Sequence, residues 1–426
     1  MVDATIVGPA ISGSSNLAEL FGRPLRLLVL CYELPPIGGG TGVACSQVLR
    51  LLARRGDLQI EVISSSPTEQ AETFYEGSMT VHLLPVGKRH LSFWQPDELL
   101  RWMLGAARLG RSLAAETPFD LCHCWSGLPS GVVGWWLRDR QPYLVSLRGS
   151  DTPGYNRRLR LLDPLLLRHV ARRIWRDATG VFAVSPSLRA MARATAPELT
   201  IGLLPNGVDA EFFRPRRNPG RATFVFAGRL IERKGVDCLL EAARIVAARH
   251  PGLRLTIAGD GPERTPLEQL RDSLGIGAQV AMVGQLGRAE LATLLGEAGV
   301  IVLPAVTDAM PNVVLEGMAA GMAVIATETS AAGIVDGNGQ LVPPRDAGAL
   351  AAAIERYLLE PRLLAAHQRR SRELALDRSW DAVAEDHVRR FRRAVLAGQP
   401  SRWGALPQAR ALGRKQLHKP TGADHR

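Results

Sequence analysis

Pro304-Ala-Val-Thr-Asp-Ala-Met-Pro-Asn-Val-Val-Leu-Glu-Gly-Met-Ala-Ala-Gly-Met-Ala-Val-Ile-Ala-Thr327 follows an apolar run in the second half of the chain. This pattern predicts the end of a strand, a loop that carries Asp308, and a helix opened by Pro311 and Asn312. The helix start can hold a phosphate with its free N–H groups. Glu316, about one turn inside the helix, could accept two ribose hydroxyls. Alternatively, Glu316 is only a helix-surface residue.

Short apolar runs alternate with amphipathic stretches along the whole chain. Such runs are typical of buried parallel strands with helices on both faces of a sheet. The fold class is therefore α/β, with two doubly wound, Rossmann-like domains that face each other across a cleft. The expected strands are Leu25–Leu30, Ile60–Ser64, Val81–Pro85, Leu121–Cys124, Tyr143–Ser146, Val181–Val184, Phe224–Ala227, Leu253–Ala258, Val280–Val283, Val300–Leu303 and Val324–Ala326.

The best linker is Leu204–Gly220, which is dense in prolines and turn formers. Open α/β sheets bind ligands outside the carboxyl ends of their strands, so the cleft is where we expect chemistry. The expected division is an N-terminal extension at 1–22, a first Rossmann-like domain at 23–213, a second Rossmann-like domain at 214–380, a helix at 381–398 that returns to the first domain, and a basic, disordered tail at 399–426.

Two cations stand where the second domain begins. Phe226-Ala-Gly-Arg-Leu-Ile-Glu-Arg-Lys-Gly235 runs from a strand through a loop into a helix. Arg229 leaves the strand end and Lys234 precedes the helix, so both could converge on one point in the cleft. A diphosphate suits them, because arginine offers a planar fork and lysine a compact charge. The alternative is solvated surface charge.

A glycine-rich loop follows the first strand. Gly38, Gly39 and Gly40 stand between that strand and a helix, where they let the backbone approach a ligand closely. The loop is neither a dinucleotide-binding G-x-G-x-x-G nor a Walker loop. A flexible turn is the alternative.

Composition narrows the class of protein. With 46% hydrophobic and 22% charged residues, the chain has the balance of a folded globular protein. No apolar stretch reaches the roughly 18 residues of a membrane span, and the five cysteines form no disulfide framework, so we expect a cytoplasmic protein. The formal charge of +11 implies an anionic partner: nucleic acid, an anionic membrane or a phosphorylated substrate.

Taken together, these motifs resemble glycosyltransferase family 4, the retaining enzymes of the GT-B fold. The resemblance covers roughly Arg23 to Arg393 and rests on Gly228-Arg-Leu with Lys234-Gly, on Ala258-Gly-Asp-Gly-Pro262, and on Asp308 with the helix through Glu316. It implies that Arg229 and Lys234 grip the donor diphosphate, that Glu316 holds the ribose, and that Asp308 contacts the transferred sugar. The residues expected to bind the donor are Gly38, Gly39, Gly40, Gly228, Gly261, Pro311, Asn312, Val313 and Glu316, beside the catalytic Arg229, Lys234 and Asp308.

Two departures concern the reacting centre. The first acidic position is usually Glu and is Asp308 here, which is one methylene shorter. Many relatives carry a His-Gly pair with Asp two residues on, whereas this chain reads Ser146-Leu-Arg-Gly-Ser-Asp151. Arg148 cannot act as a base at neutral pH, but it can hold a phosphate or an acidic sugar. We place Arg148 and Asp151 on the acceptor side.

The resemblance implies a retaining transfer from a nucleoside-diphosphate sugar to a glycan or lipid-linked acceptor, in cell-surface polysaccharide or glycolipid synthesis. We expect no cofactor and no metal ligands, since the two cations can do an ion's work. The basic stretch Arg157–Arg176 could lie on an anionic membrane with Trp175 at the interface, at the inner face of the cell membrane. Its alternative is a core-packed amphipathic helix.

Two rival classes remain. Another GT-B enzyme, an epimerase or a phosphorylase, would need paired acid and base groups or a cofactor lysine, and neither has a clear candidate. A nucleic-acid-binding protein would need interleaved aromatic and basic residues, whereas aromatics are only 5% of this chain. We therefore expect no nucleic-acid partner.

Overall fold

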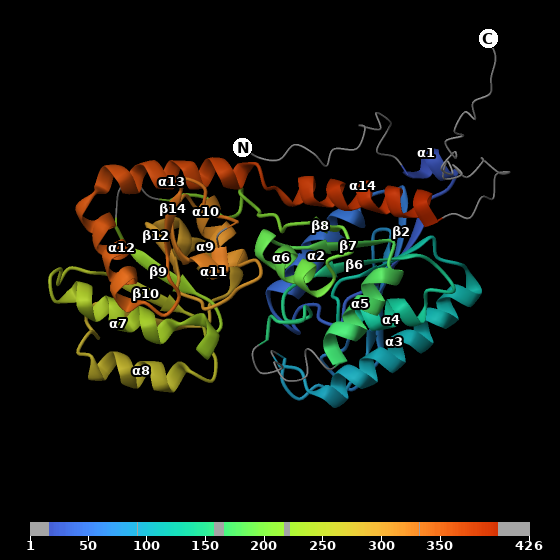
Figure 1. Ribbon diagram of the computed structural model, residues 1–426, viewed down its shortest axis with the longest axis horizontal. Coiled ribbons are helices and arrows are strands. Elements are labelled where there is room, and N and C mark those ends of the chain that lie inside the picture. The colour runs from blue at the N-terminus through green and yellow to red at the C-terminus, as the bar shows by residue number, and fades with distance from the viewer. Residues whose placement is uncertain (1–16, 92, 157–165, 217–221, 332, 399–426) are drawn as a thin grey trace, which may run out of the picture.

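The computed structural model describes residues 17–91, 93–156, 166–216, 222–331 and 333–398. They form two lobes side by side, each built on a mainly parallel sheet, with α13 and α14 running along one side of both (Figure 1). The two-domain α/β prediction is confirmed.

The first sheet has eight strands, of which all but β3 run parallel to their neighbours. In spatial order they are β3 (Glu72–Glu76), β4 (Met79–Leu84), β2 (Leu58–Ser65), β1 (Leu25–Leu30), β5 (Leu121–Cys124), β6 (Tyr143–Leu147), β7 (Gly180–Ala183) and β8 (Ile201–Leu203). The short β8 and the antiparallel β3 were not predicted. All five residues of β3 are exposed, so it has no apolar run to reveal it.

Alternating residues of β1 fill two cores, one on each face of this sheet. Leu28 and Leu30 pack on one face with Trp102 and Trp175. Leu27 and Val29 pack on the other with residues of α2 and α14. The helices of this domain are α1 (Leu17–Phe21), α2 (Gly40–Leu52), α3 (Pro96–Glu116), α4 (Ser130–Trp136), α5 (Arg168–Asp177) and α6 (Pro186–Thr195).

The second sheet has six parallel strands around one core. In order they are β11 (Val280–Gly284), β10 (Leu255–Ala258), β9 (Phe224–Ala227), β12 (Val300–Leu303), β13 (Ala323–Thr327) and β14 (Gly339–Val342). The helical segments are the 3-10 helix η3 (Glu232–Lys234), α7 (Val236–Ala247), α8 (Arg264–Ser273), α9 (Arg288–Glu297), α10 (Asn312–Ala319), α11 (Glu328–Ala331), α12 (Ala347–Leu359) and α13 (Pro361–Leu376).

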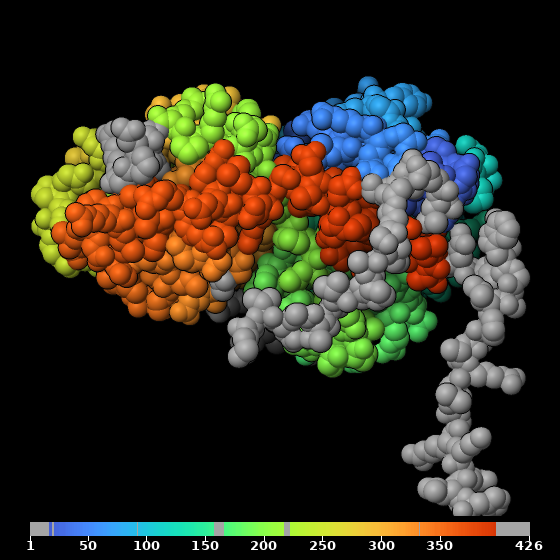
Figure 2. All heavy atoms as spheres, turned by 90° about the horizontal axis from the view of Figure 1, so that it is seen from above, coloured from blue at the N-terminus to red at the C-terminus, as the bar shows by residue number. Residues whose placement is uncertain are grey.

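The chain crosses between the domains twice, and the two crossings pair. Val208 forms a parallel bridge with Ser379, and its N–H donates to the carbonyl of Arg378 at 2.8 Å. After this crossing, α14 (Trp380–Gly398) packs on the first domain, where Phe391 is buried against the sheet. Figure 2 shows α13 and α14 from above, extending across both lobes.

Packing modifies the expected domain limits at two places. Leu17, assigned to the N-terminal extension, is buried in the first domain, and its N–H donates to Asp57 at 2.8 Å. Val208 and Phe213, assigned to the first domain, are buried in the core of the second. The expected tail at 399–426 lies outside the described residues.

The basic stretch is only partly described, since residues 157–165 fall outside the described ranges. In α5, Ala171, Ile174 and Trp175 are buried in the core. Trp175 is 1% exposed and packs in the core of the first domain, so it does not lie at a membrane interface. The described part of the stretch is the core-packed amphipathic helix that was the alternative. Among the described helices, none is long and apolar enough to cross a bilayer.

Candidate functional site

Each sheet has one point where the strand order reverses, and the expected site residues follow the strands at these points. In the second sheet the reversal separates β9 from β12, and in the first it separates β1 from β5. Loops that leave such strands diverge, which opens a crevice at the carboxyl edge. Arg229 and Lys234 follow β9, and Asp308 follows β12.

Glycines allow the loops after β9 and β10 to lie directly on each other. A Cβ on Gly259 would fall 1.8 Å from the carbonyl oxygen of Gly228, and one on Gly261 would fall 2.3 Å from that of Leu230. Both glycines have positive φ angles. Gly259 and Gly261 therefore let their loop lie against the backbone of Gly228 and Leu230, on either side of Arg229.

Lys234 and Asp308 meet in the structure. The Lys234 ammonium lies 2.5 Å from Oδ2 of Asp308, and both side chains are largely buried. Their segments are tied together, because the N–H of Val306 donates to the carbonyl of Arg233 at 2.8 Å. Gly235 makes this approach possible, since a Cβ there would fall 2.3 Å from the carbonyl oxygen of Pro304.

Asn312, the first residue of α10, reaches the other domain. Its side-chain amide donates to the carbonyl of Gly40 at 3.0 Å and accepts from Nδ2 of Asn206 at 2.7 Å. Asn206 in turn accepts from Nη1 of Arg148 at 3.0 Å. This set of contacts, here called the Asn bridge, joins the glycine loop, the linker and the acceptor-side loop to α10.

The start of α10 is also where an anion could be held. Pro311 is the residue before the helix, and Val313 is partly exposed in its first turn. The first N–H groups of a helix have no partner inside it. Glu316 lies one turn further in and is partly buried, and burial raises the pKa of its carboxyl to about 7 against the opposing charge of Arg288.

The glycine loop faces Arg229 across the domain boundary. A Cβ on Gly39 would lie 4.0 Å from Cζ of Arg229, and one on Gly40 would lie 3.3 Å from Nδ2 of Asn312. Burial lowers the pKa of Arg229, and the charge of Arg233 lowers it further, while Glu33 and Asp308 raise it. The structure therefore brings the glycine loop, Arg229 and α10 together.

Arg148 and Asp151 have different surroundings. The guanidinium of Arg148 stacks 3.9 Å above the ring of Trp125, and burial lowers its pKa to about 10. Its Nε and Nη2 atoms are buried without a hydrogen-bond partner among the described residues. Asp151 accepts from the N–H groups of Gly127, Arg148 and Gly149 at 2.6 to 3.1 Å. Asp151 therefore holds its own loop in shape.

Three residues of this region were not expected from the sequence. Glu33 lies buried beneath the glycine loop. Tyr155 accepts from Nη1 of Arg233 at 3.4 Å, across the domain boundary. Asn206 belongs to the Asn bridge. The position of Glu33, directly between the first strand and the glycines, was a signal for it, whereas Tyr155 has no pattern around it.

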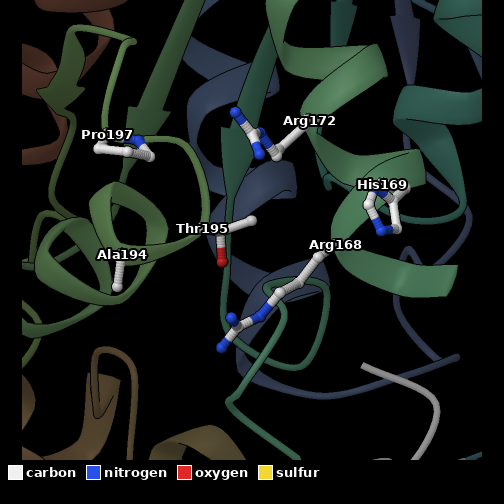
Figure 3. A pocket seen from close by; sticks show the side chains of 6 residues that line it. All are labelled: Arg168, His169, Arg172, Ala194, Thr195 and Pro197. Carbon is white, nitrogen blue, oxygen red and sulfur yellow. The ribbon is translucent and has the colours of Figure 1, made fainter. Parts of the chain in front are cut away.

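A shallow hollow of about 340 Å³ lies elsewhere on the first domain, between α5 and the end of α6 (Figure 3). It is lined by Arg168, His169, Arg172, Ala194, Thr195 and Pro197, and contains none of the expected site residues. Within the described ranges, no three His, Cys, Asp or Glu side chains are grouped so that they could hold a metal ion.

Two family models match consecutive parts of the chain. The Glycosyl transferase 4-like domain matches residues 39–207, and Glycosyl transferases group 1 matches residues 208–374. Glycogen synthase of Mycobacterium tuberculosis is 36% identical over 392 residues, covering 84% of this chain and 92% of that protein. D-inositol 3-phosphate glycosyltransferase of Saccharomonospora viridis is 28% identical over 426 residues, covering 88% and 95%.

Solved structures have the same architecture. Sucrose-phosphate synthase from Thermosynechococcus elongatus superposes with a TM-score of 0.76 at 24% identity, covering 88% of this chain and all of that one. HepE of Anabaena, solved with UDP-glucose, superposes at 0.67 with 18% identity, covering 87% and 100%. At these identities the likeness shows the fold. With the sequence relatives it establishes that this chain is a glycosyltransferase of the GT-B fold and belongs to the family-4 type.

Proposed function

We propose that this enzyme transfers a sugar from a nucleoside-diphosphate sugar to a glycan or lipid-linked acceptor, with retention of configuration and without a metal ion. The observation that carries the proposal is the meeting of Arg229, Lys234 and Asp308 around the reversal point of the second sheet. Two cations and one carboxylate at such a point suit a sugar attached to a diphosphate.

Each group has one part in the proposed donor site. Arg229 and Lys234 neutralise the diphosphate, and the N-terminus of α10 adds its unpaired N–H groups. Glu316 accepts the ribose hydroxyls, while Asp308 contacts the transferred sugar. In the free enzyme Lys234 is paired with Asp308, so donor binding lets the phosphate share this cation.

The proposed chemistry is electrostatic. Negative charge develops on the departing diphosphate as the anomeric bond breaks, and preformed cations stabilise that charge. In the route that the family resemblance implies, the acceptor hydroxyl attacks from the face the nucleotide leaves, and the diphosphate takes its proton. Arg229 and Lys234 supply positive charge at the position where a metal ion would otherwise act.

Ligands bound to proteins of the same fold support the nucleotide-sugar donor. HepE was solved with UDP-glucose, and a trehalose-6-phosphate enzyme of Escherichia coli with UDP-2-fluoro glucose. Glycogen synthase and the inositol-phosphate glycosyltransferase differ in their acceptors, so the acceptor must be argued from this chain. Arg148, with two buried N–H donors, favours an acceptor that carries an anionic group.

An apolar rim favours an acceptor presented at a lipid surface. We use this name for Leu91, Phe93, Leu100 and Leu104, whose side chains are between 45% and 54% exposed. The carbonyl of Leu91 accepts from the N–H of Gly38 at 2.8 Å, so the rim adjoins the glycine loop. Exposed apolar groups flanked by cations are typical of peripheral membrane contact, here at the cytoplasmic face. Arg89 and Arg101 supply those cations, and both pair with the one carboxylate of Asp97.

The donor assignment is tested with Lys234→Ala. Thermal stabilisation by UDP-, GDP- and ADP-sugars first identifies the donor, because a bound ligand raises stability by mass action. The variant should keep its fold and lose transfer, whereas Arg249→Ala, an exposed cation of the same domain, should keep both. Full activity of Lys234→Ala refutes the donor site. The anomeric configuration of the product tests whether the transfer is retaining. Activity measured in the presence of a metal chelator tests whether the enzyme works without a metal ion.

The membrane contact is tested by liposome flotation. Leu100→Ser combined with Leu104→Ser should reduce flotation with anionic vesicles, since it removes two exposed apolar side chains from the rim. Leu359→Ser, which alters an even more exposed leucine on the second domain, is the control. If all variants float equally, the proposed membrane contact of the rim is wrong, and the proposed donor site is not affected.

A further inference from the structure

Glu33 is a buried acidic residue in the cleft that the proposed mechanism does not use. It follows β1 and is 9% exposed. Its backbone is enclosed: a Cβ on Gly42 would fall 2.3 Å from its carbonyl oxygen, which also accepts from the thiol of Cys31 at 3.3 Å. A carboxyl at this position has lost most of its water and depends on the surrounding protein groups.

The carboxyl of Glu33 lies directly beneath the glycine loop. A Cβ on Gly38 would fall 2.3 Å from its Oε2 atom, and Gly38 has a φ of +85°. The next residue, Gly39, lies beside the guanidinium of Arg229, with 4.0 Å between a Cβ built there and Cζ. Two residues without side chains therefore separate a carboxyl of the first domain from a cation of the second.

The charges around Glu33 come from several elements. Burial, with a smaller contribution from Asp151, raises the pKa of its carboxyl to about 7, against the effects of Arg229, a hydrogen bond from Thr41 and Lys88, which lower it. Tyr32 and Cys45 also face it, and Glu33 raises the pKa of both. Of the charged groups, Arg229 has the largest effect, and Glu33 in turn raises the pKa of Arg229.

We propose that Glu33 is a positioning residue that holds Arg229 toward the glycine loop in the free enzyme and takes up a proton when the donor diphosphate binds. The inference rests on the proposed function, because it needs a diphosphate at Arg229. In the free enzyme the carboxylate supplies the negative charge near Arg229, and in the complex the diphosphate supplies it. A proton from solvent converts it to a neutral carboxyl, which stays beneath Gly38 without repelling the donor.

The direction of the proton exchange follows from the charges around Glu33. A diphosphate brings negative charge to Arg229 and withdraws that cation from Glu33, and both changes favour the protonated carboxyl. Protons are therefore taken up above the free-state pKa of about 7, where Glu33 is otherwise ionised. By linkage, donor affinity falls as pH rises through this range. Glu33→Gln, which carries no charge, should lose both effects.

The test is calorimetric titration with the nucleotide sugar that binds among UDP-glucose, GDP-mannose and ADP-glucose. Their diphosphates have no group that titrates near neutral pH, so the slope of binding enthalpy against buffer ionisation enthalpy counts protons exchanged by the protein. We expect the wild type to take up more protons per donor than Glu33→Gln just above neutral pH. Glu61→Gln is the matched control, since Glu61 is equally buried in the first domain and pairs with His82.

Thr41→Val gives an independent readout if Glu33→Gln does not fold. It removes the hydroxyl that favours the ionised carboxyl, so the pH at which uptake begins should move upward. Equal proton counts in the wild type and Glu33→Gln, or an unmoved pH range in Thr41→Val, overturn the inference while the donor site stands. Failure of all three nucleotide sugars to bind the wild type overturns the proposed donor site and this inference with it.

Discussion

The two carboxyl edges that face each other differ in what their charged side chains contact. On the second domain, the contact between Lys234 and Asp308 is one between side chains at the edge of the cleft. On the first domain, Asp151 accepts from three backbone N–H groups, and Glu33 lies beneath a glycine. Charges of the second edge can exchange partners with a ligand, whereas those of the first edge shape the loops that the ligand meets.

This difference predicts two kinds of defect. Substitutions on the second edge should reduce catalysis more than stability, because the groups there pair with other side chains and not with the buried backbone. Substitutions on the first edge should reduce stability as well, since they leave buried backbone groups unpaired. Residues of the Asn bridge, which contact both edges, should affect donor binding.

The largest effect is expected for Asp308→Ala. It removes both the proposed sugar contact and the partner that orients Lys234, so transfer should fall by roughly 100-fold to 1000-fold, the range for losing one preorganised electrostatic group. Steady-state kinetics with the identified donor measure it. Asp336→Ala is the control, because Asp336 is an exposed carboxylate of the same domain paired with Arg370. A variant with wild-type kcat would remove Asp308 from the reacting centre.

Asp151→Ala should have the next largest effect, and the effect should be a loss of stability. Its carboxylate accepts from Gly127, Arg148 and Gly149, and the variant leaves these N–H groups buried without a partner. The free energy of unfolding should fall by about 3 kcal/mol, as measured by urea denaturation. Asp272→Ala removes an exposed carboxylate and should change it by less than about 0.5 kcal/mol. Equal stability of both variants would contradict the structural role of Asp151.

The second edge could be predicted from sequence because its residues are local to strand ends. Arg229, Lys234 and Asp308 each stand within a few residues of an apolar run, and the structure brings Lys234 and Asp308 into contact. Strands with longer apolar runs were found at or near their observed limits. β3, which has no buried residue, and the short β8 and β14 were missed.

The first edge could not be predicted in the same way, because its contacts join distant segments. Asn206 and Asn312 are 106 residues apart, and Asn312 and Gly40 are 272 apart. Asp151 was expected near the acceptor, but its oxygens are used by the backbone of Gly127 and its own loop. Residue type and spacing carry no information on such pairings.

Asn312→Ala tests the Asn bridge. The variant removes the hydrogen bonds to Gly40 and Asn206, which hold α10 against the glycine loop. At about 1 kcal/mol for each bond, donor affinity should weaken by roughly 30-fold. Asn206→Ala should weaken it less, and the double variant should equal Asn312→Ala, since both lose the same contact. Additive effects on the measured Kd would show that the two residues act separately.

Glu316→Gln is expected to have the smallest effect and compares the two edges directly. Burial raises the pKa of both Glu33 and Glu316 to about 7, but the donor should act on them in opposite directions. Ribose hydroxyls donate to the ionised form of Glu316, so donor affinity should fall as pH falls through about 7, whereas Glu33 weakens it as pH rises. Donor Kd measured from about pH 6 to about pH 8 should pass through an optimum in the wild type. In Glu316→Gln the weakening of donor binding below the optimum pH, a few-fold in Kd, should disappear while the weakening above it stays. In Glu33→Gln only the weakening above the optimum pH should disappear. If one variant abolished both limbs, the two carboxyls would titrate as one coupled pair and the division between the edges would be wrong.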